Sequence, residues 1–261
     1  MRALVTGEVD FNLGWEASLR AAMSGMPVKI VAALASKPLH VLITRSEIRA
    51  GKDLKGKALG VDSLFSTTDF LSRVAARYLG IEPEKDVGIV EFGSAMLRLE
   101  TLKTGDIHAT VLDVAAAVKA EEGGFRQLLH LGSIIDLPTF GVSVNTTKLA
   151  THRESIKRFL RATLKGARFI TRNRTDTIRI IQSYLKTTSS LAAKSYDLAV
   201  GSFTEDGLVS DRALALSVRR ARDEVPFTND FLLSQAADWS VLREITAERR
   251  KIPFWLRESN P

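Results

Sequence analysis

The sequence contains no cysteine among its 261 residues. This absence excludes disulfide bonds, thiol nucleophiles and cysteine-ligated zinc, and it is compatible with an oxidising or a reducing compartment. Long apolar runs are also missing, because no stretch approaches the roughly 20 apolar residues that a membrane span needs. The N-terminus shows no basic segment followed by an apolar core and a small-residue cleavage site, so no export signal is visible. We therefore expect a globular chain that either stays inside the cell or is a mature or shortened form.

Motifs of catalysis and metal binding are absent as well. The chain has no Gly-x-Ser-x-Gly elbow, no phosphate loop and no glycine-rich dinucleotide fingerprint. Its histidines show no HExxH pattern and no pair at metal-ligand spacing. They are His40, His108, His130 and His152. We accordingly expect no metal, no cofactor and no enzymatic activity.

The basic residues outnumber the acidic ones and give a net charge of +7. Such a charge suits nucleic acids or anionic small molecules as partners. The basic residues are nevertheless dispersed, and "KRFLRATLKGARFITRNR" (residues 157–174) has the pattern of a solvated face of an amphipathic helix. We expect no nucleic-acid partner.

One pattern occurs twice. "LVTGEVDFNLG" (residues 4–14) and "LKTGDIHATVL" (residues 102–112) align with an offset of 98, which pairs Gly7 with Gly105. Each copy is typical of a helix end, a glycine C-cap and a short apolar strand, followed by another helix and strand. The repeat favours two α/β lobes of like construction, although a chance similarity between two such units remains the alternative.

The second copy is preceded by a strand–helix–strand–helix segment. "ALGV" (58–61) and "GIVEF" (88–92) are predicted strands, and helices are predicted at 66–80 and 94–105. Short alternating elements of this kind favour a mostly parallel, doubly wound sheet.

Two further strands bracket this segment. "HVLITR" (40–45) precedes it and "FGVSVN" (140–145) follows it, so these two are predicted to connect an inserted lobe to the rest. The expected lobes are therefore residues 1–45 with 140–261 (lobe I) and residues 46–139 (lobe II), and the helices after residue 147 are expected to complete lobe I.

In this order and spacing, the motifs resemble a known family. "DLKGKALGV", "GSAMLRLETLKTGDIHA" and "ESIKRFLRATLKGARFI" are similar to segments of ABC-importer solute-binding proteins of the nitrate/sulfonate/taurine/thiamine-precursor group, the NMT1/THI5-like proteins. The resemblance covers essentially the whole chain. It implies a two-lobed periplasmic-binding-protein type II fold in which two hinge strands join the lobes. It also implies that a small anionic or zwitterionic solute, such as a sulfonate, nitrate, bicarbonate or a thiamine precursor, binds between the lobes for delivery to a membrane permease. A monomer is expected.

The chain departs from this family at its start. Members of the family begin with an export signal, a strand, a helix and a second strand, whereas this sequence opens at the helix end that corresponds to residues 102–105. About 45 residues of lobe I are then expected to be missing. A periplasmic location follows if the protein is exported. If the short N-terminus is native, the alternative is a cytoplasmic ligand-sensing or regulatory module with the same fold.

Candidate ligand contacts follow the predicted strands. In an open α/β sheet, ligands bind beyond the carboxyl ends of the strands. A helix start offers free N–H groups and partial positive charge, and Ser/Thr hydroxyls add donors, so residues 66–68 and Ser94 are candidates to bind an anion. The predicted ligand-binding residues are Trp15, Ser63, Phe65, Ser66, Thr67, Thr68, Gly93, Ser94 and Asp113.

Five of these candidates also have a structural interpretation. Ser66 and Ser94 are typical N-caps, and Asp113 is more readily an N-cap than a partner for a ligand amine. Trp15 and Phe65 suit either the aromatic walls of a site or packing near the hinge.

Overall fold

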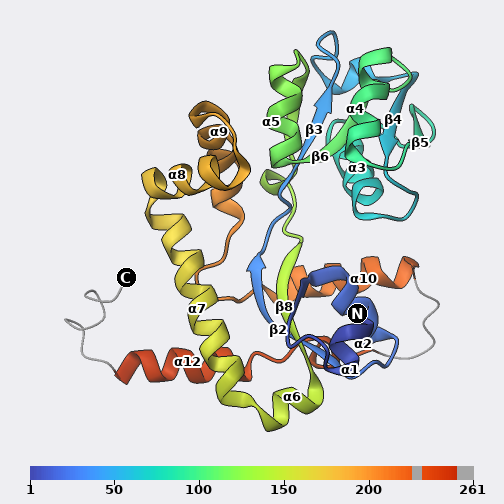
Figure 1. Cartoon of the computed structure of the whole chain (residues 1–261). Coiled ribbons are helices and arrows are strands. Elements are labelled where there is room, and N and C mark those ends of the chain that lie inside the picture. Colours follow the sequence, from blue (N-terminus) through green and yellow to red (C-terminus); the bar gives the residue numbers. More distant parts are fainter. Residues whose placement is uncertain (225–230, 252–261) are drawn as a thin grey trace. The chain divides into compact units, whose positions relative to one another are not determined.

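The computed structural model describes residues 1–224 and 231–251, and they form two compact units (Figure 1). Unit 1 consists of Met1–Pro38, Asp136–Thr177 and the described residues from Ser202 onward, and unit 2 consists of Leu39–Ile135 and Ile178–Gly201. Among the described residues, no helix is both long enough and apolar enough to cross a membrane.

Unit 2 is built on a five-stranded sheet with the order β5-β4-β6-β3-β7. β4 runs parallel to both β5 and β6, whereas β3 lies antiparallel to both β6 and β7. Its elements are β3 (His40–Thr44), β4 (Lys57–Val61), α3 (Thr67–Tyr78), β5 (Val87–Glu91), α4 (Ala95–Thr104), β6 (Ala109–Asp113), α5 (Val114–Glu122), β7 (Arg126–His130), most of α8 (Arg174–Leu185) and α9 (Ser189–Ala199).

The core of unit 2 joins this sheet to its helices. Val41 and Ile43 of β3 are fully buried and pack with Leu102 of α4 and with Ala117 and Val118 of α5. α3 packs against β4 and β6. Helices that follow parallel strands in this way are set with their N-termini at the carboxyl ends of those strands.

Unit 1 contains a smaller sheet with the order β1-β8-β2, in which β8 pairs antiparallel with both neighbours. Its described elements are α1 (Arg2–Thr6), β1 (Asn12–Gly14), α2 (Trp15–Met23), β2 (Val28–Ala35), β8 (Phe140–Asn145), α6 (Thr146–Thr151), α7 (Arg153–Arg172), α10 (Asp211–Glu224), α11 (Leu233–Ala236) and α12 (Ser240–Lys251).

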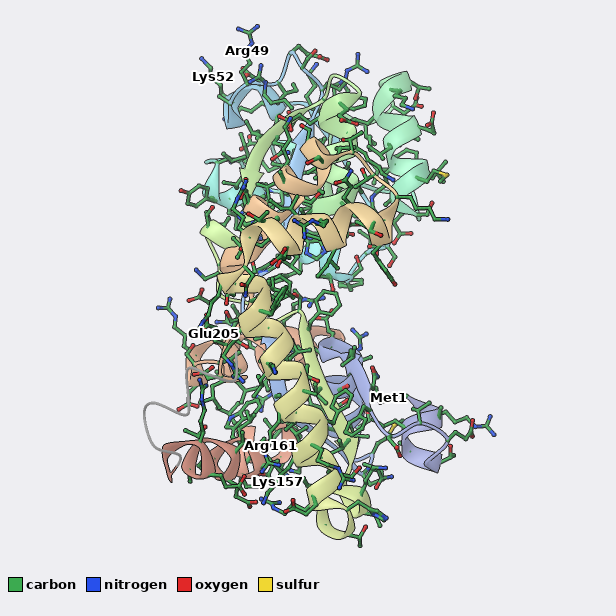
Figure 2. All side chains as sticks on the ribbon, turned by 60° about the vertical axis from the view of Figure 1, so that its left-hand side comes forward. Met1, Arg49, Lys52, Lys157, Arg161 and Glu205 are labelled. Atoms are coloured by element: carbon green, nitrogen blue, oxygen red, sulfur yellow. The ribbon has the colours of Figure 1, made fainter. Side chains whose placement is uncertain are left out.

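Two helices of unit 1 are held together by ion pairs. From α7, Lys157 pairs with Glu244 at 2.8 Å and with Glu248 at 3.1 Å, and Arg153 and Arg161 pair with the same two carboxylates of α12. Lys157 and Arg161 are labelled in Figure 2. The basic face that the sequence predicts on this helix is therefore in part an intramolecular contact surface rather than a wholly solvated one.

The sheets correct the expected topology. Each lobe was expected to hold a mostly parallel sheet, but both strand pairs described in the unit 1 sheet are antiparallel, and the unit 2 sheet is mixed. β1 and β2 do run in the same direction, but β8 lies between them and pairs with both. Likewise, β3 lies between β6 and β7. The pairing is long-range, so local patterns did not reveal it.

The bounds of the units differ from those of the expected lobes. The strand predicted as a connection at 40–45 lies inside the unit 2 sheet as β3, because it pairs along its length with β6 and β7. Residues 178–201, expected in lobe I, belong to unit 2, where α9 packs against α5 and Lys194 pairs with Glu121 at 3.3 Å.

Candidate ligand-binding site

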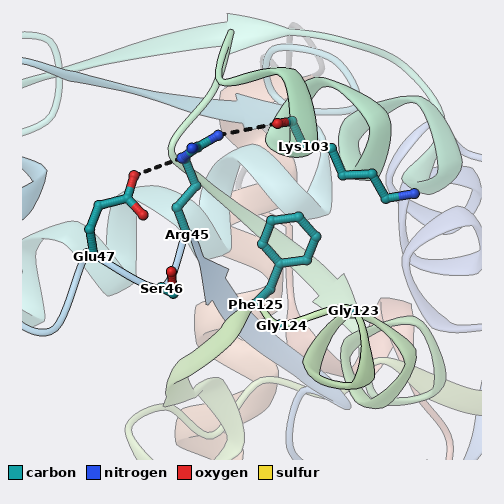
Figure 3. Close-up of a pocket in the computed structure, with 7 residues that line it drawn as sticks. All are labelled: Arg45, Ser46, Glu47, Lys103, Gly123, Gly124 and Phe125. Atoms are coloured by element: carbon teal, nitrogen blue, oxygen red, sulfur yellow. Dashed lines mark hydrogen bonds and ion pairs between the residues drawn. The ribbon is translucent and has the colours of Figure 1, made fainter.

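One pocket of about 280 Å³ opens in unit 2 beside the end of β3 (Figure 3). The Arg45 guanidinium donates to Glu47 at 2.7 Å and to the carbonyl oxygens of Leu102 and Lys103 at 3.0 and 3.3 Å. The pocket is lined by Arg45, Ser46, Glu47, Lys103, Gly123, Gly124 and Phe125. Since Thr44 pairs with Ala109, the first residue of β6, this pocket lies at the amino end of β6. It contains none of the predicted site residues, and its arginine is already bound by the C-terminal carbonyls of α4.

The predicted residues of unit 2 instead gather at the opposite edge of the sheet. β4, β5 and β6 are parallel neighbours, and each is followed by a helix, α3, α4 and α5 respectively. We call residues 62–66 after β4, residues 92–94 after β5 and Asp113 at the end of β6 the carboxyl edge of unit 2. Three helix N-termini therefore meet at this edge, which is where open α/β sheets bind ligands.

The hydroxyls after β4 bond to a carboxylate of the chain itself. Oδ1 of Asp62 accepts from Oγ of Ser66, from Oγ1 of Thr68 and, at 2.8 Å, from the backbone N–H of Ser63. Burial raises the pKa of Asp62, but these hydrogen bonds outweigh it and hold the pKa below its ordinary value. Asp62 is therefore ionised at neutral pH, and it occupies the position that the sequence assigned to a bound anion.

Phe65 is held in a conformation that non-glycine residues rarely adopt. Its φ is 65°, its side chain is 67% exposed, and its N–H donates to Asp69 at 2.8 Å. The N–H of the preceding residue, Leu64, donates to Glu91 at 2.5 Å. The carboxylates of Glu91 and Asp69 thus fix the loop in a conformation in which Phe65, a residue with a strained backbone, presents its aromatic ring to solvent. Residues with strained backbones cluster at functional sites.

The remaining unit 2 candidates lie at helix starts. Ser94 caps α4 through the N–H of Leu97, and Asp113 caps α5 through the N–H of Ala116 at 3.0 Å. Ser66 caps α3 in the same way, through the N–H of Asp69. Gly93 precedes Ser94 with a φ of 65°, and Thr67 is the first residue of α3. The capping interpretation is confirmed for all three caps, and the topology brings the unit 2 candidates to one edge.

Trp15 belongs to unit 1 and not to unit 2. It is 1% exposed in the core of unit 1, where its indole N–H donates to Oγ of Ser217 at 3.3 Å. Packing explains this residue, and in this structure no ring surface is left for a ligand.

Sequence reasoning missed Arg98, which lies beneath the carboxyl edge. Its side chain is on α4 and 3% exposed, and it donates to the carbonyl of Gly93 at 2.7 Å and to that of Val111 at 3.4 Å. Burial lowers the pKa of Arg98, and the charges of Asp62 and Asp113 oppose that effect. The one available signal was helical spacing, because Arg98 stands four residues before the buried Leu102.

A histidine completes this buried group. His40, the first residue of β3, pairs in register with Asp113, and within the described part of the chain no hydrogen bond reaches its Nδ1. Burial lowers the pKa of His40, so the imidazole is neutral at pH 7. Across residues 1–224 and 231–251, no group of His, Asp and Glu side chains is arranged to hold a metal ion.

Apolar side chains flank the polar ones at the same edge. Leu64 is 43% exposed beside Phe65, and Met96 and Leu97 in the first turn of α4 are 76% and 51% exposed. The carboxyl edge of unit 2 therefore offers both apolar surface and oriented polar groups, the combination typical of small-molecule sites.

Comparisons with known proteins agree with this fold. The riboflavin-binding protein RibY of Chloroflexus aurantiacus is 26% identical over 157 residues, which are 57% of this chain and 42% of RibY, so the match spans less than half of that relative. The periplasmic aliphatic sulphonate binding protein SsuA of Escherichia coli aligns with a TM-score of 0.74 at 19% identity, covering 91% of this chain and 78% of SsuA. The desulfurization enzyme DSZB aligns with a TM-score of 0.71 at 13% identity, covering 92% of this chain and 86% of the enzyme.

These structural likenesses concern the fold, which both binding proteins and an enzyme adopt. A family model described as NMT1/THI5 like matches residues 1–177, well over half of the sequence. The chain therefore belongs to the NMT1/THI5-like family.

Proposed function

We propose that the protein binds a small organic solute at the carboxyl edge of unit 2 and delivers it to an ABC importer without changing it chemically. The observation that carries the proposal is the convergence of three helix N-termini, α3, α4 and α5, beside the exposed ring of Phe65. Helix N-termini supply oriented donors, and an exposed aromatic ring supplies a stacking surface for an organic body.

The names of the similar proteins support this class of function. RibY is named for riboflavin and SsuA for aliphatic sulphonates, and both are binding proteins. For this chain we infer an anionic or zwitterionic solute with an apolar or aromatic part, and sulfonates and thiamine precursors are the first ligands to test. Since SsuA is named as a periplasmic protein, we infer a periplasmic location. We also propose that the protein is a monomer and works with a membrane permease.

A thermal-shift screen of the full chain tests the proposal. The panel contains riboflavin, the sulfonates taurine and ethanesulfonate, and 4-aminopyrimidine and pyrimidine as ring fragments that stand for the thiamine precursors. Nitrate and bicarbonate are included as simple inorganic anions. A ligand present at 100 times its Kd adds roughly 2.7 kcal/mol to the free energy of unfolding, which is readily detected as a higher Tm. If no member of the panel raises Tm, the proposed function is wrong for these solutes.

Two exposed aromatic residues of α3 and its preceding loop provide a matched pair for locating the site. Phe65 at the carboxyl edge is 67% exposed, and Tyr78 at the other end of α3 is 64% exposed. We expect Phe65→Ala to weaken binding of any hit at least tenfold and Tyr78→Ala to leave it unchanged. Equal effects of the two substitutions would place the ligand away from this edge.

A further inference from the structure

The N-terminus of α3 already holds a negative charge. Asp62 directly follows the last residue of β4, and its Oδ1 accepts three hydrogen bonds from the first residues of the loop and helix, namely Ser63, Ser66 and Thr68. These hydroxyls and this N–H are the donors that a bound sulfonate or nitrate would use. They are not available to a free anion while the Asp62 carboxylate remains in place.

Other donors of the loop are bound by carboxylates too. The N–H of Leu64 is bound by Glu91 and the N–H of Phe65 by Asp69. An incoming anion would therefore find few unbound donors in residues 63–65 and would approach two nearby carboxylates, Asp62 and Glu91. Like charges at short range disfavour binding, and at a partly buried position water and salt screen the repulsion only weakly.

The positive charge of Arg98 does not cancel the negative charge of the carboxylates at this edge. The guanidinium is buried, is tied by its Nη atoms to the carbonyls of Gly93 and Val111, and lies in the electrostatic field of Asp62 and Asp113. Of the four charged groups Asp62, Glu91, Asp113 and Arg98, three are therefore negative and one is positive. Within the described chain, Nε of Arg98 has no partner, so one donor is left at the ends of β5 and β6.

One acceptor is left as well. Within the described part of the chain, the hydrogen bonds to the Asp62 side chain all end on Oδ1, which leaves Oδ2 to a ligand. An ionised oxygen without a donor favours a hydrogen-bond donor or a cation as its partner.

We infer that Asp62 determines the specificity of the carboxyl edge of unit 2: it excludes simple anions from the N-terminus of α3 and selects a solute that presents an amine or another N–H donor there. The inference rests on the proposed function and narrows it. Of the two solute classes in the proposed function, anionic and zwitterionic, Asp62 favours the zwitterionic one. An amino-substituted heterocycle meets the same requirement, because it also presents an N–H donor.

Probe pairs that differ by one amino group test this selection. Taurine and ethanesulfonate form one pair, and 4-aminopyrimidine and pyrimidine form the other. We expect the wild-type chain to bind the amino member of at least one pair tenfold or more tightly, and Asp62→Asn to abolish the preference. The control Asp106→Asn changes an exposed carboxylate in the turn after α4, where Thr104 donates to it, and is expected to keep the preference.

A second experiment needs no identified solute. In Asp62→Ala the hydroxyls of Ser66 and Thr68 lose their acceptor, so formate is expected to bind there and to restore part of the lost Tm. Sodium chloride at equal ionic strength is the control, and the wild-type Tm is expected not to respond to formate beyond that control.

The outcomes separate the inference from the proposed function. If solutes bind but the amino group and Asp62→Asn make no difference, and formate restores nothing, the inference is overturned and the binding function stands. If formate restores Tm but no solute in the panel binds, the internal anion is confirmed while the proposed function fails for these solutes, and the inference about specificity fails with it.

Discussion

Gly7 and Gly105 end two helices 98 residues apart in the same left-handed conformation, with φ of 81° and 93°. The likeness extends to the hydrogen bonds around each glycine. The N–H of Val9 donates to the carbonyl of Ala3 at 3.1 Å, and at the same offset the N–H of Ile107 donates to that of Thr101 at 3.3 Å.

The two copies also have the same sheet topology. The order β1-β8-β2 in unit 1 matches β6-β3-β7 in unit 2, with the middle strand antiparallel to both neighbours in each. The repeated sequence pattern is therefore a structural repeat, and each copy is built around a glycine C-cap.

The role of Gly7 as a C-cap predicts that two glycine-to-alanine substitutions in unit 1 change the stability in opposite directions. Gly7→Ala is expected to lower the free energy of unfolding by about 1 kcal/mol, since the left-handed conformation costs an L-residue roughly that much. Gly166→Ala, in the interior of α7, is expected to raise it by about 0.5–1 kcal/mol through helix propensity. A Cβ at either position meets nothing within 4 Å, so sterics do not confuse the comparison. Urea unfolding measures both, and equal signs would refute the capping argument.

The sequence predicted what is local in this fold. A glycine C-cap, a serine N-cap and the strand–helix alternation from β4 to α5 depend on neighbouring residues, and all are present. The central positions of β3 and β8 depend on partners far along the chain, so the same strands were predicted only as connections.

The candidate site likewise has local features that the sequence predicts and long-range contacts that it does not. The edge that gathers residues 63–68, 93–94 and 113 followed from strand direction alone. Arg98 was missed because an arginine within a helix usually faces solvent, and its burial depends on the ends of β5 and β6. Asp62 is not among the predicted ligand-binding residues, because no local pattern shows that its carboxylate binds the Ser66 and Thr68 hydroxyls.

The ion pairs between α7 and α12 predict an acid-sensitive contact. Hydrogen bonds from Arg153 and Lys157 lower the pKa of Glu244 to about 2. A depressed carboxylate pKa stabilises the fold above the unfolded-state value, near 4.3, and this stabilisation is lost as the pH falls through the folded value. The difference in unfolding free energy between wild type and Glu244→Gln is therefore expected to be under about 1 kcal/mol at pH 7 and to shrink between pH 4.5 and pH 2. Urea unfolding across this range measures it, and Glu100→Gln, from an exposed pair with Lys103, serves as the control.

Trp15 and Phe65 are expected to respond in opposite ways. Trp15→Phe removes a hydrogen bond and volume from a buried core position, so it is expected to cost about 1–3 kcal/mol of stability and to leave solute affinity unchanged. Phe65→Ala truncates an exposed ring, so stability is expected to change by less than about 0.5 kcal/mol while affinity falls. Calorimetry on both variants with one solute separates the two roles, and a loss of affinity in Trp15→Phe would contradict the packing assignment.

Arg98 is expected to control the ionisation of Asp62 from beneath the carboxyl edge. Its charge is one of the causes that lower the pKa of Asp62, so Arg98→Met is expected to raise that pKa. Asp62 contributes stability above its unfolded pKa, and this contribution is lost as the pH falls through its folded pKa. In the variant the contribution is expected to be smaller, and its loss is expected to be complete at a higher pH. The carboxyl carbon shift of Asp62, followed by NMR against pH, reports the change directly. Arg45→Met removes a guanidinium at the amino end of β6 and is expected to leave the Asp62 titration where it is in wild type. If Asp62 titrates identically in all three proteins, Arg98 is a packing residue without electrostatic influence on the proposed site.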